Sequence, residues 1–467
     1  ELYLLQKLMR GIGSGNVDHR LRQSDFSLDD KARGGFWLGM PVTDMSRMNR
    51  MLVVGSNLRK DHPLMAHRIR ESVRWGGQLN LINAAEDEFL GKVQNKRIVA
   101  PSQLATSLAG VCRALAELKN VAVPEIAAQG VVDDSARAMA ESLAGGERKA
   151  VFLGNMAQHH PTYAQIHAMA QALAKLAGAS FGVLGEAANS VGAVAVGAIP
   201  TRGALGAQAI RGLNAQQMLA APLSAYLLLG VEVELDTHDP LTAMQSVEGA
   251  DFVVVMAPYK GRSLDYADVL LPIAPWTETS GTFVNTEGRV QSFQAVVNPL
   301  GETRPAWKVL RVLGNLLGLP GFDYDSSEAV RRDAQTNAGK PDNAISMFDP
   351  QRDAPQATGD IERIAEVPIY QTDPLVRRAK SLQATADALP PVASVNGKLL
   401  DRLGLADGDM IIVGQDDAKV SIPVRRDDRV ADNCVRLATA HPLTSDLGDM
   451  FGAISVSRAA GELRKQA

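Results

Sequence analysis

Short apolar runs that alternate with helical patterns constrain this chain more than any other feature. In several segments between these runs, apolar residues recur every three or four positions, which is typical of amphipathic helices. Continuous apolar strands separated by helices indicate parallel sheets that are covered on both faces. We therefore predict an α/β protein with two doubly wound parallel-sheet domains. The strand-like runs occupy residues 51–54, 79–84, 150–153, 225–231 and 251–256.

The same pattern sets the expected domain boundaries along the 467 residues. The first α/β domain is placed at residues 1–205 and the second at residues 206–320. From 321 to 391 the periodicity fails and prolines accumulate, so this segment is interpreted as a linker that wraps a surface. Within 392–467, apolar and polar residues alternate around a Gln-Asp-Asp turn, which predicts hairpins in a small β-barrel-like domain.

Composition excludes several classes of function. The net charge of −4 offers no basic field for nucleic acid. No apolar run is long enough to span a bilayer, so no direct membrane insertion is expected. Two cysteines cannot hold a four-thiolate iron–sulfur cluster or a cysteine-rich zinc site. Cys112 lies on the apolar stripe of a helix that Ser102 is expected to cap, so it is interpreted as a core thiol.

Single motifs leave the chemistry open. Turns that follow predicted strands, at 54–57, 154–155 and 257–258, are either binding loops or plain turns, because ligands of open α/β sheets bind at the carboxyl ends of strands. The G-x-S-x-G match at 178–182 follows a helix, whereas a nucleophile elbow needs a strand before the serine. Glu278 and Glu287 are either paired carboxylates or ordinary hydrogen-bonding residues of a loop.

Three segments together resemble one family. ADVLLPIAPWTETSGTFVNTEGRVQ at 267–291 resembles a segment that molybdopterin oxidoreductases share, with the pattern A-D-V-x-L-P followed by E-x-x-G-T-x-x-N-x-E-G-R-x-Q. VVGSNLRKDHPLMAHRIR at 53–70 resembles the strand–loop–helix of that family, and DRLGLADGDMIIV at 401–413 resembles the start of its pterin-binding barrel. The resemblance implies the molybdopterin oxidoreductase fold, with 392–467 as a truncated form of the barrel.

A narrower resemblance is carried by HRLRQSDF at 19–26 and by residues 153–175 and 185–200. These segments are similar to the large iron–sulfur subunit (75 kDa) family of NADH:quinone oxidoreductase, respiratory complex I. The resemblance implies a structural scaffold, not catalytic by itself, for electron transfer from NADH to quinone coupled to proton translocation. Its partners would be other peripheral-arm subunits, on the cytoplasmic side of the bacterial inner membrane.

The same resemblance implies that this segment binds no cofactor and has no catalytic or metal-binding residues. In that family, [2Fe-2S] and [4Fe-4S] clusters belong to an N-terminal portion, which we expect to be missing here because the chain starts at Glu1 without Met.

The resemblance also locates the remains of a pterin pocket. Asn285, Glu287 and Arg289 are expected to pair within a loop, and Gly281 and Gly288 to shape turns. The alternative is an active molybdopterin oxidoreductase, such as a formate dehydrogenase-like catalytic subunit, with molybdopterin bound and Ser24 on the metal. The candidate pocket residues are Arg22, Ser24, Gly55, Asn57, Asn285, Glu287 and Arg289.

Overall fold

The computed structural model describes residues 1–203, 209–336, 340–346 and 360–459. The chain forms two compact units, each assembled from several stretches of sequence. Parts of the expected linker at 321–391 and of the expected barrel domain at 392–467 lie outside the described residues. Unit 1 consists of Glu1–Trp37, Ala187–Ala344 and Tyr370–Thr385, and unit 2 consists of Leu38–Glu186, Ile345–Ile369 and Ala386–Ala467.

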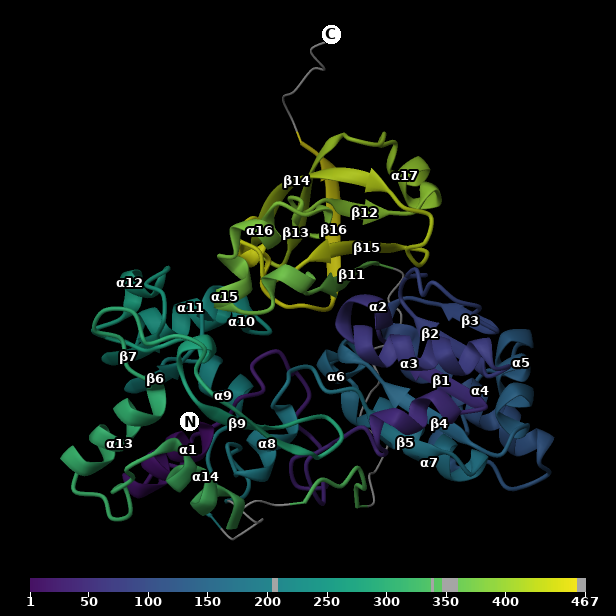
Figure 1. Cartoon of the computed structure of the whole chain (residues 1–467). Helices are drawn as coiled ribbons and strands as arrows, with labels where there is room; N and C mark the ends of the chain where they lie inside the picture. Colours follow the sequence, from purple (N-terminus) through teal and green to yellow (C-terminus); the bar gives the residue numbers. More distant parts are fainter. Residues whose placement is uncertain (204–208, 337–339, 347–359, 460–467) are drawn as a thin grey trace. The chain divides into compact units, whose positions relative to one another are not determined.

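Unit 2 contains a five-stranded parallel sheet in the order β3-β2-β1-β4-β5 (Figure 1). The central strand β1 pairs with β2 on one side and with β4 on the other, so the strand order reverses between β1 and β4. Helices cover the sheet, which is why the residues of the central strands are almost all buried. The strands are β1 (Arg50–Val54), β2 (Gln78–Asn83), β3 (Asn95–Ile98), β4 (Lys149–Leu153) and β5 (Ser180–Val183).

The helices around this sheet follow the apolar periodicity of the sequence, with one corrected boundary. Ser102 does not cap its helix, because the helix begins at Leu104 and the Ser102 hydroxyl donates to Glu362 Oε1 at 2.6 Å. Cys112 is fully buried, as predicted, and burial raises the pKa of its thiol to about 12. The helices are α2 (Leu58–Asp61), α3 (Pro63–Arg74), α4 (Leu104–Leu118), α5 (Asp134–Ala144), α6 (Asn155–His159) and α7 (Tyr163–Ala177).

A closed barrel completes unit 2, in the strand order β11-β15-β12-β14-β13-β16. Its first strand, β11, comes from the segment that was expected to be a linker. This strand pairs in parallel with β15 and carries the buried Arg363. The predicted hairpin is present as β13 and β14, which turn at Asp416 and Asp417. The barrel elements are β11 (Ile361–Glu366), β12 (Ala393–Val395), α17 (Gly397–Leu403), β13 (Met410–Gln415), β14 (Ala418–Arg426), β15 (Cys434–Ala438) and β16 (Ala453–Arg458).

Unit 1 is built on a three-stranded parallel sheet in the order β6-β7-β8 and on a separate β9–β10 hairpin. The first helix of the chain belongs here and not to the first sheet, because its buried face, including Leu4 and Leu8, shares a core with Met256 and Trp307. The strands are β6 (Ala225–Leu229), β7 (Phe252–Ala257), β8 (Val269–Pro272), β9 (Gly281–Val284) and β10 (Val290–Phe293).

The helices of unit 1 are mostly short. Those longer than two turns are α1 (Leu2–Gly11), α11 (Pro240–Glu248), α13 (Ala306–Leu316) and α14 (Ser327–Thr336). The remainder are α8 (Ser190–Ala195), α9 (Ala215–Leu219), α10 (Val233–Asp236), α12 (Ser263–Tyr266), α15 (Pro374–Arg377) and α16 (Lys380–Gln383). Within the described part of the chain, no helix combines the length and the apolar character needed to cross a membrane. The prediction of an α/β protein with parallel sheets and a terminal barrel is confirmed.

Candidate functional site

The reversal of strand order between β1 and β4 marks the place where an open α/β sheet binds ligands. Here the two loops at the carboxyl ends of these strands touch each other directly. The N–H of Met156 donates to the carbonyl of Gly55 at 3.0 Å. A Cβ placed on Gly154 would lie 2.2 Å from the Cβ of Ser56, so the loops leave no space for a side chain. Gly55 has a φ of +64°, a left-handed conformation that favours glycine, and this conformation brings its loop into contact with the loop after β4.

Buried polar atoms gather beneath these loops. Ser56 Oγ and Asn83 Oδ1 are buried and have no hydrogen-bond partner among the described residues, and the buried His62 lies within hydrogen-bonding reach of Asn155. Burial lowers the pKa of His62 to about 4, against the opposing effects of Glu186 and Asn155, so the imidazole is neutral near pH 7. Neutral donors and acceptors of this kind are suited to bind ordered water.

A polar cavity of about 320 Å³ lies at the same end of the sheet, inside unit 2. One wall is the loop and helix after β1, and the opposite wall is the barrel. The candidate residue Asn57 lines this cavity. Its cationic lining residues are Arg59, Lys60, Arg425, Arg429 and Arg436.

Carboxylates of the same cavity neutralise most of these cations. Arg436 on β15 has the most buried position, and it donates to two carboxylates at 2.7 Å each. Arg425 is an exposed residue of β14, and its side chain takes part in none of the ion pairs found among the described residues. The cavity therefore presents little unpaired positive charge to an anionic ligand. The pairs are Arg436 with Asp87 and Glu366, Arg59 with Glu88, Lys60 with Asp387, and Arg429 with Asp427.

Asp61 adds a carboxyl group to the loop itself. Its Oδ2 accepts the N–H of Asn57 at 3.0 Å, at the start of α2. Burial, with smaller contributions from the nearby Glu366 and Asp87, raises the pKa of Asp61 to about 7, whereas the hydrogen bond from the N–H of Asn57 and the charge of Arg436 oppose the shift. A backbone donor that could bind a phosphate is therefore already used by a carboxyl group of the same loop.

The other candidate residues belong to unit 1. Asn285 Oδ1 accepts the N–H of Arg289 at 2.9 Å and that of Glu287 at 3.2 Å, and Arg289 Nε lies 3.3 Å from Glu287 Oε1. The expected pairing within the β9–β10 turn is thus present. Glu278 has a different role, because its Oε2 accepts the N–H of Leu300 at 3.0 Å.

Arg22 and Ser24 also lie in unit 1, in the stretch between α1 and Trp37. Arg22 donates to Asp236 at 3.0 Å, and Arg377 donates to the same carboxylate at 2.5 Å. Over the described ranges, no group of three His, Cys, Asp or Glu side chains is arranged to hold a metal ion. Arg22 is therefore engaged in an ion-pair network of unit 1.

The sequence analysis did not identify the acidic residues and Arg436 that line the polar cavity. Asp61 follows Asn57 by four residues, a spacing that permits a side chain to accept the N–H at the start of a helical turn. That signal was available within the strand–loop–helix motif. Arg436 and Asp87 are 349 residues apart in sequence, and no local pattern connects them.

Comparisons with known proteins match the chain over most of its length. The family model described as molybdopterin oxidoreductase matches residues 1–316. The probable oxidoreductase YjgC of Bacillus subtilis (strain 168) is 25% identical over 410 residues, which is 72% of this chain and 40% of that protein. A formate dehydrogenase-like protein of Staphylococcus aureus (strain bovine RF122 / ET3-1) is 41% identical over 78 residues, or 17% of this chain and 8% of that protein.

Among solved structures, acetylene hydratase from Pelobacter acetylenicus is similar with a TM-score of 0.66 and 13% sequence identity. The match covers 98% of this chain and 84% of that chain, and at this identity it shows the fold alone. The chain spans well under two thirds of the length of the curated relatives given above.

Proposed function

Because the chain belongs to the molybdopterin oxidoreductase family, we propose that it is a structural subunit of NADH:quinone oxidoreductase that no longer binds the family's cofactor. The observation that carries the proposal is the polar cavity of unit 2, where Arg436 and its neighbours are already paired with carboxylates. The segments at 19–26, 153–175 and 185–200, which resemble the large iron–sulfur subunit of respiratory complex I, direct the proposal to this enzyme.

The polar cavity is a poor fit for a pterin dinucleotide, whose phosphates need unpaired cations or backbone N–H donors, because Arg425 is the one cation of its described lining that no ion pair engages. The carboxyl group of Asp61 takes the N–H of Asn57, and the arginines Arg429 and Arg436 are held by acidic side chains. The crevice between β1 and β4 is also filled, because the Gly55 and Gly154 loops are in direct contact. The paired charges of the cavity and the filled crevice support a scaffold role, and neither place favours binding of a catalytic cofactor.

As a scaffold, the chain would hold other parts of the enzyme in position. Its partners would be peripheral-arm subunits on the cytoplasmic side of the bacterial inner membrane. Iron–sulfur clusters of the [2Fe-2S] and [4Fe-4S] types would transfer the electrons outside this segment, since electron transfer needs bound redox centres.

Metal analysis of the complete protein, purified from membranes with its assembly, tests the proposal. We expect NADH-dependent quinone reduction by the assembly and no stoichiometric molybdenum. Stoichiometric molybdenum, or co-purification with subunits of a different enzyme, would contradict it.

The second candidate is an active molybdopterin oxidoreductase. It is favoured by the 41% identity with the formate dehydrogenase-like relative over 78 residues. In that case Ser24 would ligate molybdenum, and Ser24→Ala would remove both the metal and formate oxidation. Under the scaffold proposal, the same variant keeps the NADH:quinone activity of the assembly and leaves its metal content unchanged.

A further inference from the structure

The loop after β6 in unit 1 is built like the loop after β1 in unit 2. In both loops a glycine with positive φ follows the strand, Gly230 at +67° and Gly55 at +64°. The N–H of Glu232 then donates to Asp236 Oδ2 at 2.9 Å, which is the same contact, four residues apart, that closes the loop after β1. Ligands of open parallel sheets bind at the carboxyl ends of strands, so this loop marks the ligand edge of the β6-β7-β8 sheet.

A segment from much later in the chain covers this edge. Tyr370–Thr385 belongs to unit 1, whereas the residues on both sides of it belong to unit 2. We call Tyr370–Thr385 the strap. Of its residues, all of which the structure describes, Gln371 alone is buried. Apolar burial therefore contributes little to holding the strap on unit 1.

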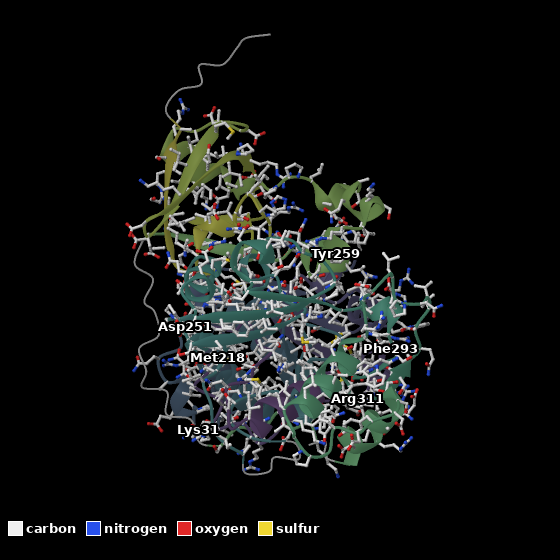
Figure 2. The ribbon with its side chains drawn as sticks, turned by 90° about the vertical axis from the view of Figure 1, so that its left-hand side faces the viewer. Lys31, Met218, Asp251, Tyr259, Phe293 and Arg311 are labelled. Atoms are coloured by element: carbon white, nitrogen blue, oxygen red, sulfur yellow. The ribbon has the colours of Figure 1, made fainter. Side chains whose placement is uncertain are left out.

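Arg377 of the strap lies between two carboxylates of the edge. Its Nη1 donates to Glu232 Oε2 at 2.8 Å, and its Nη2 donates to Asp236 Oδ1 at 2.5 Å. The side chain of Arg377 is only 5% exposed. Arg378 donates to the other carboxylate oxygen of Glu232, and its Cζ lies 4.5 Å from the ring centre of Tyr259, which is labelled in Figure 2. A planar cation of the strap thus occupies the ligand edge.

The backbone of the strap depends on this attachment. Its helices α15 and α16 contain four residues each. Their N–H groups donate to carbonyls of the strap itself, for example Arg377 to Asp373 at 3.1 Å and Ala384 to Lys380 at 3.1 Å. Helices this short are unstable in water without tertiary contacts. A detached strap would therefore unfold, while the β6-β7-β8 sheet keeps the hydrogen bonds between its strands.

The edge is acidic once the strap is removed. Within the described chain, both ion-pair partners of Glu232 come from the strap, whereas Asp236 also pairs with Arg22. Glu234 on the same helical turn is buried as well. Burial, with smaller contributions from Glu232 and Asp236, raises the pKa of Glu234, whereas its backbone hydrogen bond and Arg262 oppose the shift. Buried carboxylates that lose their partner favour the binding of another cation.

We propose that the strap is a lid over the ligand edge of the unit 1 sheet, and that Arg377 is its latch. With the latch closed, the guanidinium group fills the edge. When another planar cation replaces it, the strap opens and its two short helices unfold. The open edge takes a guanidinium or amidinium group, because planar N–H donors match paired carboxylate oxygens. Such a lid can operate in a scaffold and in a cofactor-binding enzyme alike, so its test is independent of the proposed function.

Amide hydrogen exchange of the complete protein tests the lid, with guanidinium chloride as the probe. Sodium chloride at the same concentration of about 0.2 M is the control, because it screens charges equally without the planar donors. We expect residues 375–385 to exchange at least about threefold faster in guanidinium chloride than in sodium chloride, and β7 to exchange equally in both. Equal exchange of the strap in the two salts would overturn the proposal, as would an equal acceleration of β7.

Arg377→Ala removes the latch without a probe. Exchange of residues 375–385 should rise at least about tenfold in plain buffer, with β7 unchanged, and the difference between the two salts should disappear. The matched control is Lys380→Ala, which removes an exposed cation of the same strap and should exchange like the parent chain.

Glu232→Gln provides a second route to the open lid if Arg377→Ala unfolds unit 1. It keeps the size of the side chain, removes the charge that both strap arginines bind, and should open the strap in the same way. A strap that stays protected in Glu232→Gln, or a Lys380→Ala strap that opens as far as the latch variants, would overturn the proposal.

Discussion

The carboxyl edge of the five-stranded sheet and the open edge of β10 differ in how their polar groups are used. At the first, carboxylates hold the arginines and the loops after β1 and β4 contact each other. At the second, β10 pairs with β9 alone among the described strands, and the side chains of Val290 and Val296 are exposed. The first region resembles a ligand site of its fold class by position, yet most of its charged groups are already paired within the chain.

This difference teaches that position within a fold does not by itself identify the working surface. A ligand site needs donors that are free to bind, and buried polar groups that are already satisfied stabilise structure instead. The ion pairs of the first region lead to stability predictions, because a site of this kind loses stability when one partner of a buried pair is removed.

Removal of Arg436 should have the largest effect on stability. Arg436→Ala leaves Asp87 and Glu366 as uncompensated, partly buried carboxylates, and loss of one partner of a buried pair costs about 3–5 kcal/mol. Amide hydrogen exchange of the barrel strands measures this local free energy without assuming that the whole chain unfolds in one step. The control Arg458→Ala removes an exposed partner of Asp409 and should cost less than about 1 kcal/mol. Similar losses in both variants would show that the cavity is not held by its ion pairs.

Gly154→Ala should have an intermediate effect. The added Cβ would lie 2.2 Å from Ser56 Cβ and 2.5 Å from the carbonyl oxygen of Gly55, so the loops must move apart. We expect the free energy of unfolding to fall by about 1–3 kcal/mol, which is the usual cost of overpacking. Gly145→Ala is the matched control, since its nearest new contact is at 3.5 Å and its φ of −83° suits alanine. If Gly154→Ala were as stable as this control in thermal unfolding, the crevice would have room for a ligand.

The sequence predicted those elements that depend on local periodicity. The runs at 51–54 and 150–153 are β1 and β4, each of which begins one residue earlier and ends where predicted, because a fully buried strand is apolar along its length. The assembly of the units was not predictable in the same way. Helix α1 packs with Trp307, and β11 joins a barrel whose other strands lie beyond residue 392, and both contacts depend on packing between distant parts of the sequence.

The candidate residues divide along the same line. Asn285, Glu287 and Arg289 lie within five positions, so their pairing could be predicted from a turn motif. Ser102 was predicted from the local pattern to cap its helix. Its hydroxyl donates instead to Glu362, which is distant in sequence. The role of these residues as a former pterin pocket stays a prediction, because it concerns ancestry and not a contact within the chain.

Asp61 should give the smallest effect, and one that depends on pH. Burial raises the pKa of its carboxyl group to about 7 in the folded chain, whereas an aspartate in an unfolded chain titrates near 3.9. Because the folded pKa is the higher one, the contribution of Asp61 to stability is fully present below about pH 4 and is lost as the pH rises towards 7.

Asp61→Asn keeps an acceptor for the N–H of Asn57 but cannot ionise. At about pH 4, where the Asp61 carboxyl of the folded chain is protonated, the variant and the parent chain should unfold with equal free energy. At pH 8 the variant should be more stable by about 1 kcal/mol, a value reduced for the partial exposure of this side chain. Urea unfolding at both pH values, followed through hydrogen exchange at β1, measures the difference. A variant that is less stable than the parent at pH 8 would mean that the ionised carboxylate is stabilised in the cavity, and that the cavity has more unpaired positive charge than its ion pairs indicate.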